Sequence, residues 1–154
     1  MTQRESFLNE EHTELLAEIS EMSATPGETG KLFTELLNIF SAHLDREEET
    51  VLPLLGYLRD SVESLVEVSD SLFKAGKDFR TEYETMENEH NAMDNIMKTI
   101  EPNDASGKVM ELIRHIRHHV MLESEIIYPA TMTAANIVIS RTGAKGKWRS
   151  GTEL

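Results

Sequence analysis

The chain has 154 residues, of which 39% are hydrophobic and 28% charged, and this length and balance are typical of one globular domain. Its net charge of −13 argues against nucleic acid as a partner, because phosphate binding requires clustered lysine and arginine, and no apolar run approaches the ~20 residues that span a membrane. The absence of cysteine excludes disulfides and thiolate metal sites, and we expect a cytoplasmic protein that binds neither nucleic acid nor a membrane.

Four segments of the sequence have the periodicity of amphipathic helices. They cover, in chain order, residues 8–22, 31–55, 83–100 and 112–127. Signals for β-strands are nearly absent, because there are no alternating β-branched runs and no Asn-Gly or Asp-Gly hairpin turns. The sequence therefore predicts an all-α fold.

Short breaks rich in proline, glycine and helix-capping residues separate the first helix from the second and the third from the fourth. These breaks are SATPGETG, residues 23–30, and EPNDASG, residues 101–107, and such short breaks favour antiparallel neighbours. The connection over residues 53–77 is longer and is predicted to be helical in part. We expect an antiparallel up-down-up-down four-helix bundle over residues 1–139 and a flexible basic tail over residues 140–154.

The chain contains an internal repeat with an offset of 76 residues, the distance from His43 to His119 (119 − 43 = 76). HLDREEETVLP begins at His43 and HVMLESEIIYP begins at His119, and both read His, three residues, Glu, five residues, Pro. All four prolines of the chain take part in the match, and two more residues of offset place His12 on His90. The sequence therefore predicts a bundle made of two repeated helical hairpins.

The repeated motif places polar side chains on helix faces that the apolar pattern predicts to be core. Residues i and i+4 of a helix lie on one face, so His43 and Glu47 point inward together. The second repeat does the same, and one further histidine lies on the inward stripe of each remaining helix. The six inward polar residues are His12, His43, Glu47, His90, His119 and Glu123. We expect these four imidazoles and two carboxylates to converge at mid-height of the bundle.

A metal centre explains this convergence better than ion pairs do. A buried charge is costly unless it is paired or bound to metal, and two buried carboxylates that face each other repel. A dinuclear metal centre removes both costs. The alternative, two buried histidine–glutamate ion pairs, requires a charged imidazole in the core twice and leaves two histidines unexplained.

These motifs resemble those of the hemerythrin-like, or HHE, cation-binding family, and the resemblance covers roughly residues 5–135. It is carried by EEH ending at His12, HLDREEETVLP from His43, NEH ending at His90 and HVMLESEIIYP from His119. The resemblance implies a hemerythrin-like bundle with a non-haem di-iron centre. Imidazole and carboxylate ligands also suit zinc or manganese.

The resemblance further implies a role for each of the six residues. Both glutamates would bridge two iron ions, together with an oxide or hydroxide. The histidines would be paired within each repeat, so that His12 and His43 bind one iron and His90 and His119 bind the other.

The sequence departs from the oxygen-carrying members of the family at one position. Those proteins have five histidines, with a His-x3-His pair on the third helix, whereas here Met86 and Asp94 lie one turn either side of His90. Each iron would then have two imidazoles, two carboxylate oxygens and the bridging oxygen, which leaves one octahedral position open on both ions. Two open positions permit bridging chemistry with peroxide or with two diatomic molecules.

Asp94 and His115 are the candidates for the missing ligand. They replace the apolar residues Leu16 and Ile39 of the first repeat, and both lie about 6 Å along the helix axis from the layer of metal ligands. We expect them to face each other. They would then serve as a fifth protein ligand, as an outer-shell proton relay or as a structural ion pair.

The leading functional hypothesis is a non-haem di-iron protein that binds dioxygen or nitric oxide. One alternative is a redox enzyme that reduces peroxide or nitric oxide or repairs iron–sulfur clusters. The other is an iron buffer or sensor. The residues alone leave open whether the chain is an enzyme and which redox partner such an enzyme would use.

Overall fold

The fold is given by a computed structural model, which describes the backbone of residues 3–144 and the side chains of residues 8–142. Its helices are α1 (Gln3–Ser23), α2 (Glu28–Asp60), α3 (Asp70–Asn103), α4 (Gly107–Leu122) and α5 (Tyr128–Ala144). A π-helical turn, Glu123–Ile127, joins α4 to α5, so that these segments form one long rod. The described residues contain no β-strand, which confirms the predicted all-α class. None of the described helices combines the length and the apolar character needed to cross a lipid bilayer.

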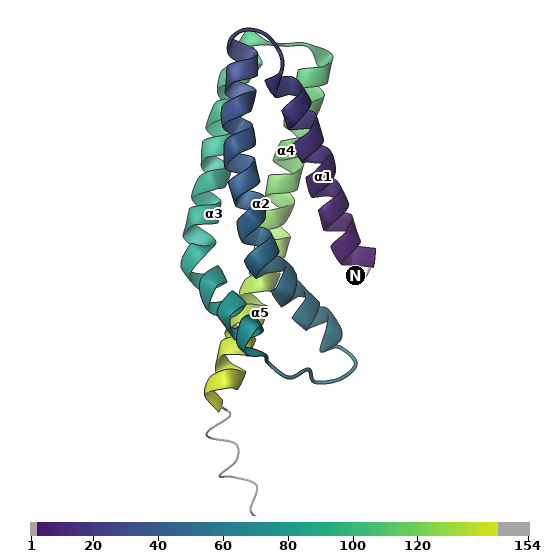
Figure 1. The fold of residues 1–154 in the computed structure, drawn as a ribbon, viewed down its shortest axis with the longest axis vertical. Coiled ribbons are helices and arrows are strands. Elements are labelled where there is room, and N and C mark those ends of the chain that lie inside the picture. Colours follow the sequence, from purple (N-terminus) through teal and green to yellow (C-terminus); the bar gives the residue numbers. More distant parts are fainter. Residues whose placement is uncertain (1–2, 145–154) are drawn as a thin grey trace, which may run out of the picture.

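The helices run alternately up and down the long axis of the molecule (Figure 1). α1 packs against α2 and α4, and α3 packs against α2, α4 and α5. This arrangement is the antiparallel four-helix bundle that the sequence predicts, with the α4–α5 rod as its fourth helix. The C-terminal part of α2 extends past the start of α1 and is in contact with α3 and α5 (Figure 1).

The break between α1 and α2 depends on two glycines. Gly27 precedes α2 with a φ of +89°, a conformation that L side chains rarely adopt. A Cβ atom on Gly30 would lie 1.7 Å from the backbone oxygen of Thr25, so only glycine fits there. This tight turn sets α1 against α2 as an antiparallel pair.

The second and third helices are longer than their periodicity predicts. α2 continues to Asp60 and α3 starts at Asp70, so that the connection between them shrinks to residues 61–69. Ser69 caps α3, because its hydroxyl accepts a hydrogen bond from the backbone N–H of Leu72 at 3.1 Å. The additional turns lengthen the bundle and make room for a second apolar core.

The last helix extends past residue 139, where the sequence predicts the end of the bundle. α5 ends at Ala144, and Arg141 holds this part of the helix by donating hydrogen bonds to the Tyr57 hydroxyl at 2.7 Å and to the backbone oxygen of Val66. The helix therefore continues five residues beyond the predicted boundary (144 − 139 = 5). The remainder of the predicted flexible tail, residues 145–154, lies outside the described residues.

Two apolar cores fill the bundle, and a polar layer separates them. The first core, between α1, α2, α3 and α4, contains Phe33, Phe40 and Ile100. The second core, between α2, α3 and α5, contains Leu54 and Phe79. Full burial of each such side chain contributes about 1.5–3 kcal/mol relative to exposure. The polar layer between the cores holds the candidate functional site.

Candidate metal centre

All six residues predicted as metal ligands meet in the polar layer between the two cores. The histidines at positions 12, 43, 90 and 119 come from α1, α2, α3 and α4, Glu47 comes from α2, and Glu123 is the first residue of the π turn. Each of the six is at most 6% exposed. The side chains therefore converge inside the bundle, as the repeat predicts.

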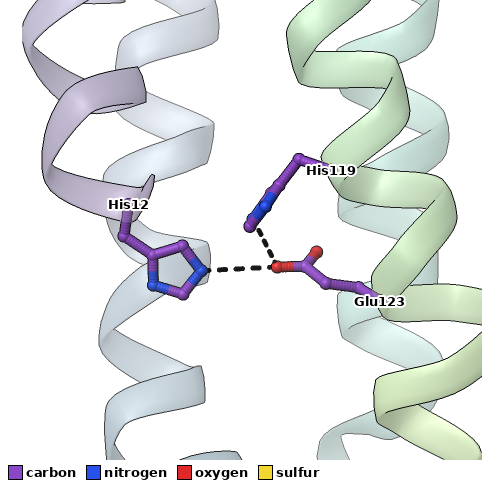
Figure 2. A group of neighbouring side chains, drawn as sticks. All are labelled: His12, His119 and Glu123. Carbon is purple, nitrogen blue, oxygen red and sulfur yellow. Dashed lines mark ion pairs between the residues drawn. The ribbon is translucent and has the colours of Figure 1, made fainter. Parts of the chain in front are cut away.

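The first group of donors, called the α1–α4 group, comprises His12, His119, Glu123 Oε1 and Glu47 Oε2. Figure 2 shows three of these residues, with one oxygen of the Glu123 carboxylate directed at both imidazoles. His119 Nε2 lies 2.6 Å and His12 Nε2 lies 3.5 Å from Glu123 Oε1. Glu47 also reaches this group, since its Oε2 lies 3.4 Å from His12 Nε2.

The second group, called the α2–α3 group, comprises His43, His90 and the remaining two carboxylate oxygens. His90 Nε2 lies 2.9 Å and His43 Nε2 lies 3.4 Å from Glu123 Oε2. His43 Nε2 also lies 3.5 Å from Glu47 Oε1. Each glutamate thus directs one oxygen to each group, which is the arrangement that a carboxylate needs to bridge two cations.

The histidines are paired between the repeats and not within them. The resemblance implies His12 with His43 and His90 with His119, whereas the structure groups His12 with His119 and His43 with His90. The ring centroids of these observed pairs are 4.9 Å and 4.7 Å apart. Both pairings join neighbouring helices, so the repeat alone cannot distinguish them. The side-chain rotamers decide which neighbour each imidazole approaches, and a sequence offset does not encode rotamers.

Several buried polar atoms of the α1–α4 group make no hydrogen bond, although they lie within ion-pair distance of one another. They are Nε2 of His12, Nε2 of His119, Oε2 of Glu47 and Oε1 of Glu123. Buried polar atoms are normally hydrogen-bonded, so each exception calls for an explanation. A cation among these atoms would accept a lone pair from all four. A donor set of nitrogen and oxygen without sulfur suits iron, zinc or manganese.

Hydrogen-bond acceptors outside the two donor groups, called outer acceptors, contact the Nδ1 atoms of two histidine rings. His43 Nδ1 lies 3.0 Å from Glu89 Oε2, and Glu89 also accepts a hydrogen bond from Arg46 Nε at 2.9 Å. His90 Nδ1 lies 3.0 Å from Ser124 Oγ. An Nδ1–H that donates to such an acceptor fixes the ring and leaves the Nε2 lone pair directed at the group.

Glu11 links the buried His119 to the half-exposed His115. His119 Nδ1 lies 3.5 Å from Glu11 Oε2, and His115 Nε2 lies 3.5 Å from Glu11 Oε1. His115 therefore lies behind a candidate ligand and does not reach the metal position itself. The sequence analysis missed Glu11, which directly precedes His12 and points along the α1–α4 side of the bundle.

Asp94 does not face His115, contrary to the prediction. Its carboxylate accepts a hydrogen bond from Arg117 Nε at 3.1 Å and pairs with Lys98 Nζ at 2.6 Å near the surface. Positions 115 and 117 of a helix differ by about 200° around its axis, so α4 presents Arg117 to α3 and His115 to α1. The prediction considers only the position of each residue along the bundle axis. It does not consider the direction in which each side chain points around its helix. Asp94 is consequently no candidate for a fifth ligand.

Tyr128 is a residue of the site that the sequence analysis does not identify. Its hydroxyl lies 2.8 Å from Glu47 Oε1. It also lies 3.2 Å from His43 Nε2 and 3.3 Å from His90 Nε2. The π turn brings it there, because the N–H of Tyr128 bonds to the carbonyl of Glu123 and five residues complete the turn. A regular α-helix would present the preceding residue instead, and only the position of the tyrosine beside the repeated proline marks it in the sequence.

A family model described as the hemerythrin HHE cation binding domain matches residues 5–131. The chain belongs to the hemerythrin HHE cation-binding family. Comparisons with curated proteins and with solved structures gave no significant match. The matched range includes both donor groups and Tyr128, so the residues gathered in the polar layer are the candidate cation ligands of this hemerythrin domain.

The third helix of this hemerythrin domain supplies only His90 to the two groups. Met86, one turn before His90, is fully buried and belongs to the second core. Asp94, one turn after His90, makes its ion pairs near the surface. A thioether is a soft ligand and a weak donor to the harder metals that imidazole and carboxylate select. Neither neighbour of His90 therefore takes the place of a fifth histidine.

The polar layer of this hemerythrin domain stabilises positive charge on two of its imidazoles, those of His43 and His119. Burial on its own would lower the pKa of His43, but hydrogen bonds to three carboxylates, Glu123 first, outweigh it and raise that pKa to about 11. Burial would raise the pKa of Glu123, yet the four neighbouring histidines hold it well below its usual value. Burial and the nearby carboxylates raise the pKa of Tyr128. A cation that binds here must displace protons from the site.

Proposed function

We propose that this hemerythrin domain binds two iron ions and that the bound pair binds dioxygen or nitric oxide. The observation that carries the proposal is the division of the carboxylate oxygens of Glu47 and Glu123 between the two histidine pairs. Two groups of two nitrogens and two oxygens, joined by two shared carboxylates, fit a dinuclear centre better than a single ion.

The donor atoms and the family favour iron, although zinc and manganese accept the same donors. When bound, iron supplies a redox-active centre at which a diatomic gas can coordinate. The chain itself holds the two metal positions apart and balances their charge with two carboxylates. Its outer acceptors, Glu89 and Ser124, orient the rings of His43 and His90.

A small cavity beside the α1–α4 group matches a diatomic ligand in size. Its volume is about 10 Å³, which is close to the smallest space that holds one water molecule. Besides His12, Glu47 and Glu123, the cavity is lined by Leu8, Val51, Leu52 and Ile127. These apolar walls disfavour ions and polar solutes, and the volume excludes an organic substrate.

The cavity lies close to a larger groove on the surface. Leu8, Leu52 and Ile127 line both the cavity and the groove, whose volume is about 980 Å³. Small rotations of these three side chains would open a path between them. An uncharged diatomic molecule can cross such an apolar wall more readily than water or an anion, because it loses little hydration.

Reduction of hydrogen peroxide is the second candidate function, and one specific observation favours it. Reduction of peroxide to two waters consumes two protons and two electrons. The contacts from His115 through Glu11 to His119 offer a route for protons from the half-exposed surface to a metal ligand. Iron–sulfur repair and iron buffering or sensing have no comparable feature among the described residues.

The proposal is tested by loading the purified protein with ferrous iron under anaerobic conditions. We expect two iron ions per chain and a new visible absorption band when dioxygen or nitric oxide is added. His119→Ala should lower the iron content, whereas the exposed neighbouring position provides the matched control His118→Ala. An iron content of one or none in the wild type, or no response to either gas, would contradict the proposal. Peroxide consumption that His115→Ala reduces would favour the second candidate.

A further inference from the structure

We propose that Tyr128 is a fifth protein ligand, through its phenolate oxygen, of the metal ion in the α2–α3 group. The inference rests on the proposed function, because it requires a metal ion in each group. It deepens that function by making the two ions unequal. The α2–α3 ion is closed to added ligands, and the α1–α4 ion alone receives the small molecule.

The position of the Tyr128 hydroxyl carries the proposal. All three hydrogen-bond partners of its oxygen are donor atoms of the α2–α3 group, at 2.8 Å from Glu47 Oε1, 3.2 Å from His43 Nε2 and 3.3 Å from His90 Nε2. A phenol oxygen within hydrogen-bond distance of three ligand atoms of one group is close to the place where those atoms would hold a cation.

The Tyr128 ring is held rigidly in this position. It is fully buried and stacks on the His90 ring at a centroid distance of 5.4 Å and an angle of 10°. Its edges contact Phe79 and Tyr83 at centroid distances of 5.9 Å and 6.0 Å. The oxygen is therefore placed before any metal arrives, and binding does not have to order the side chain.

The two ions would differ in the number of their protein ligands. The α2–α3 ion would have two imidazoles, one oxygen of each glutamate, the Tyr128 oxygen and the bridging oxide or hydroxide, which fills six octahedral positions. The α1–α4 ion lacks the phenolate and keeps one position open. The small cavity lies on this open side, against His12, Glu47 and Glu123. The cavity is an observation independent of Tyr128, and it leads to the same assignment.

Binding of the phenolate releases a proton. The phenol O–H bond breaks, the oxygen keeps the electron pair and donates it to the cation, and the proton leaves to solvent. Metal loading of the wild type should therefore release one proton more per chain than loading of Tyr128→Phe. No oxidant or reductant is needed for this step.

Ferric loading gives a direct readout, because a tyrosinate bound to ferric iron produces a visible charge-transfer band and enhanced phenolate ring modes in resonance Raman spectra. We expect both signals in the wild type and their loss in Tyr128→Phe. The chain has three tyrosines, so the double variant Tyr57→Phe with Tyr83→Phe keeps Tyr128 as its only tyrosine. This matched control should retain both signals, and it identifies the ligand even if Tyr128→Phe binds less metal.

An anion titration counts the open positions independently. We expect one azide per chain to bind the iron-loaded wild type and two to bind iron-loaded Tyr128→Phe, because the substitution opens the second ion. Two iron ions per chain without phenolate ring modes would overturn the role of Tyr128 and leave the di-iron proposal standing. Phenolate modes absent from the double variant would also overturn it. A wild-type chain that binds no iron would overturn both proposals.

Discussion

Glu47 and Glu123 divide their carboxylate oxygens in the same way. One oxygen of each lies within 3.5 Å of His12 Nε2, and the other oxygen of each lies within 3.5 Å of His43 Nε2. Each of the two carboxylates thus contacts the imidazole from α1 with one oxygen and the imidazole from α2 with the other. Neither glutamate belongs to one donor group alone, so removal of either should affect both groups.

Removal of one bridging carboxylate should therefore lower the occupancy of both metal positions. For Glu47→Ala we expect fewer than one metal ion per chain under conditions that give two in the wild type. Glu48→Ala, an exposed carboxylate next in the chain, is the matched control and should keep the full metal content. Metal analysis after gel filtration measures the result. A variant that loses one ion and retains the other at full occupancy would contradict the bridging role.

Metal binding should raise the melting temperature. The sites require the folded bundle, so free metal at 100 times its dissociation constant stabilises the protein by about 2.7 kcal/mol per site. For a chain of this size, that energy corresponds to roughly 5–10 °C. Differential scanning calorimetry with and without chelator measures the shift. Equal melting temperatures for the loaded and metal-free protein would place any bound metal outside the bundle.

The metal-free protein should lose stability as the pH rises above neutrality. The pKa of His43 is raised from 6.5 to about 11 in the folded state, so the folded chain binds more protons than the unfolded chain between these values. Stability from this group is complete below pH 6.5 and is lost as the pH approaches 11, with a slope of at most about 1.4 kcal/mol per pH unit. Urea titrations across this range measure the loss.

At acidic pH, the change of folding stability with pH has the opposite sign. The pKa of Glu123 is held well below 4.5, so its contribution is present above that pH and is lost as the pH falls. When metal is bound, His43 would act as a neutral ligand, and the alkaline loss due to its proton should disappear. Parallel alkaline profiles for the loaded and metal-free protein would contradict this assignment of the His43 proton.

Loss of an outer acceptor should weaken metal binding without removing a ligand. Glu89→Ala leaves His43 Nδ1 and Arg46 without their carboxylate partner, and we expect the metal affinity to fall about 10–100-fold. Glu84→Ala, an exposed carboxylate on the same helix, should have no effect. Competition with a chromogenic chelator measures both affinities. Equal affinities would show that the Glu89 contact does not orient the ring.

Asp94 and His115 should behave as independent residues. Because they contact different partners, the stability changes of Asp94→Leu and His115→Ile should add to within about 0.3–0.5 kcal/mol in the double variant. His115→Ile alone should slow any peroxide consumption, since it breaks the contact with Glu11. A double-mutant cycle by urea denaturation measures the coupling, and a coupling energy above 1 kcal/mol would contradict the observed separation.

The fold and the six candidate ligands could be predicted because they follow from helical periodicity. His43 and Glu47 interrupt an apolar stripe at a spacing of four, and the second repeat does so again, so convergence follows from the α-helix geometry alone. The level of Asp94 and His115 along the bundle could be predicted in the same way. Their direction around the helices could not, because it depends on which neighbouring helix each face meets.

Tyr128 could not be predicted because it depends on a local departure from the α-helix. Every position after Glu123 is rotated relative to a regular helix, and periodicity analysis assumes a constant rotation per residue. The length of α5 has a different cause. Arg141 stabilises it through hydrogen bonds to α2 and to the 61–69 connection, which are distant in sequence.

The π turn also determines how far the duplicated hairpins can remain alike. α2 is a continuous α-helix through its copy of the motif, and Val51 is buried after Glu47. In the other copy, the equivalent Ile127 is only half-buried, and the change of pitch brings a phenol inward in its place. A duplication with strict twofold symmetry would yield two interchangeable halves. One wider turn of helix makes the halves chemically distinct, while the six candidate ligands keep their places in the polar layer.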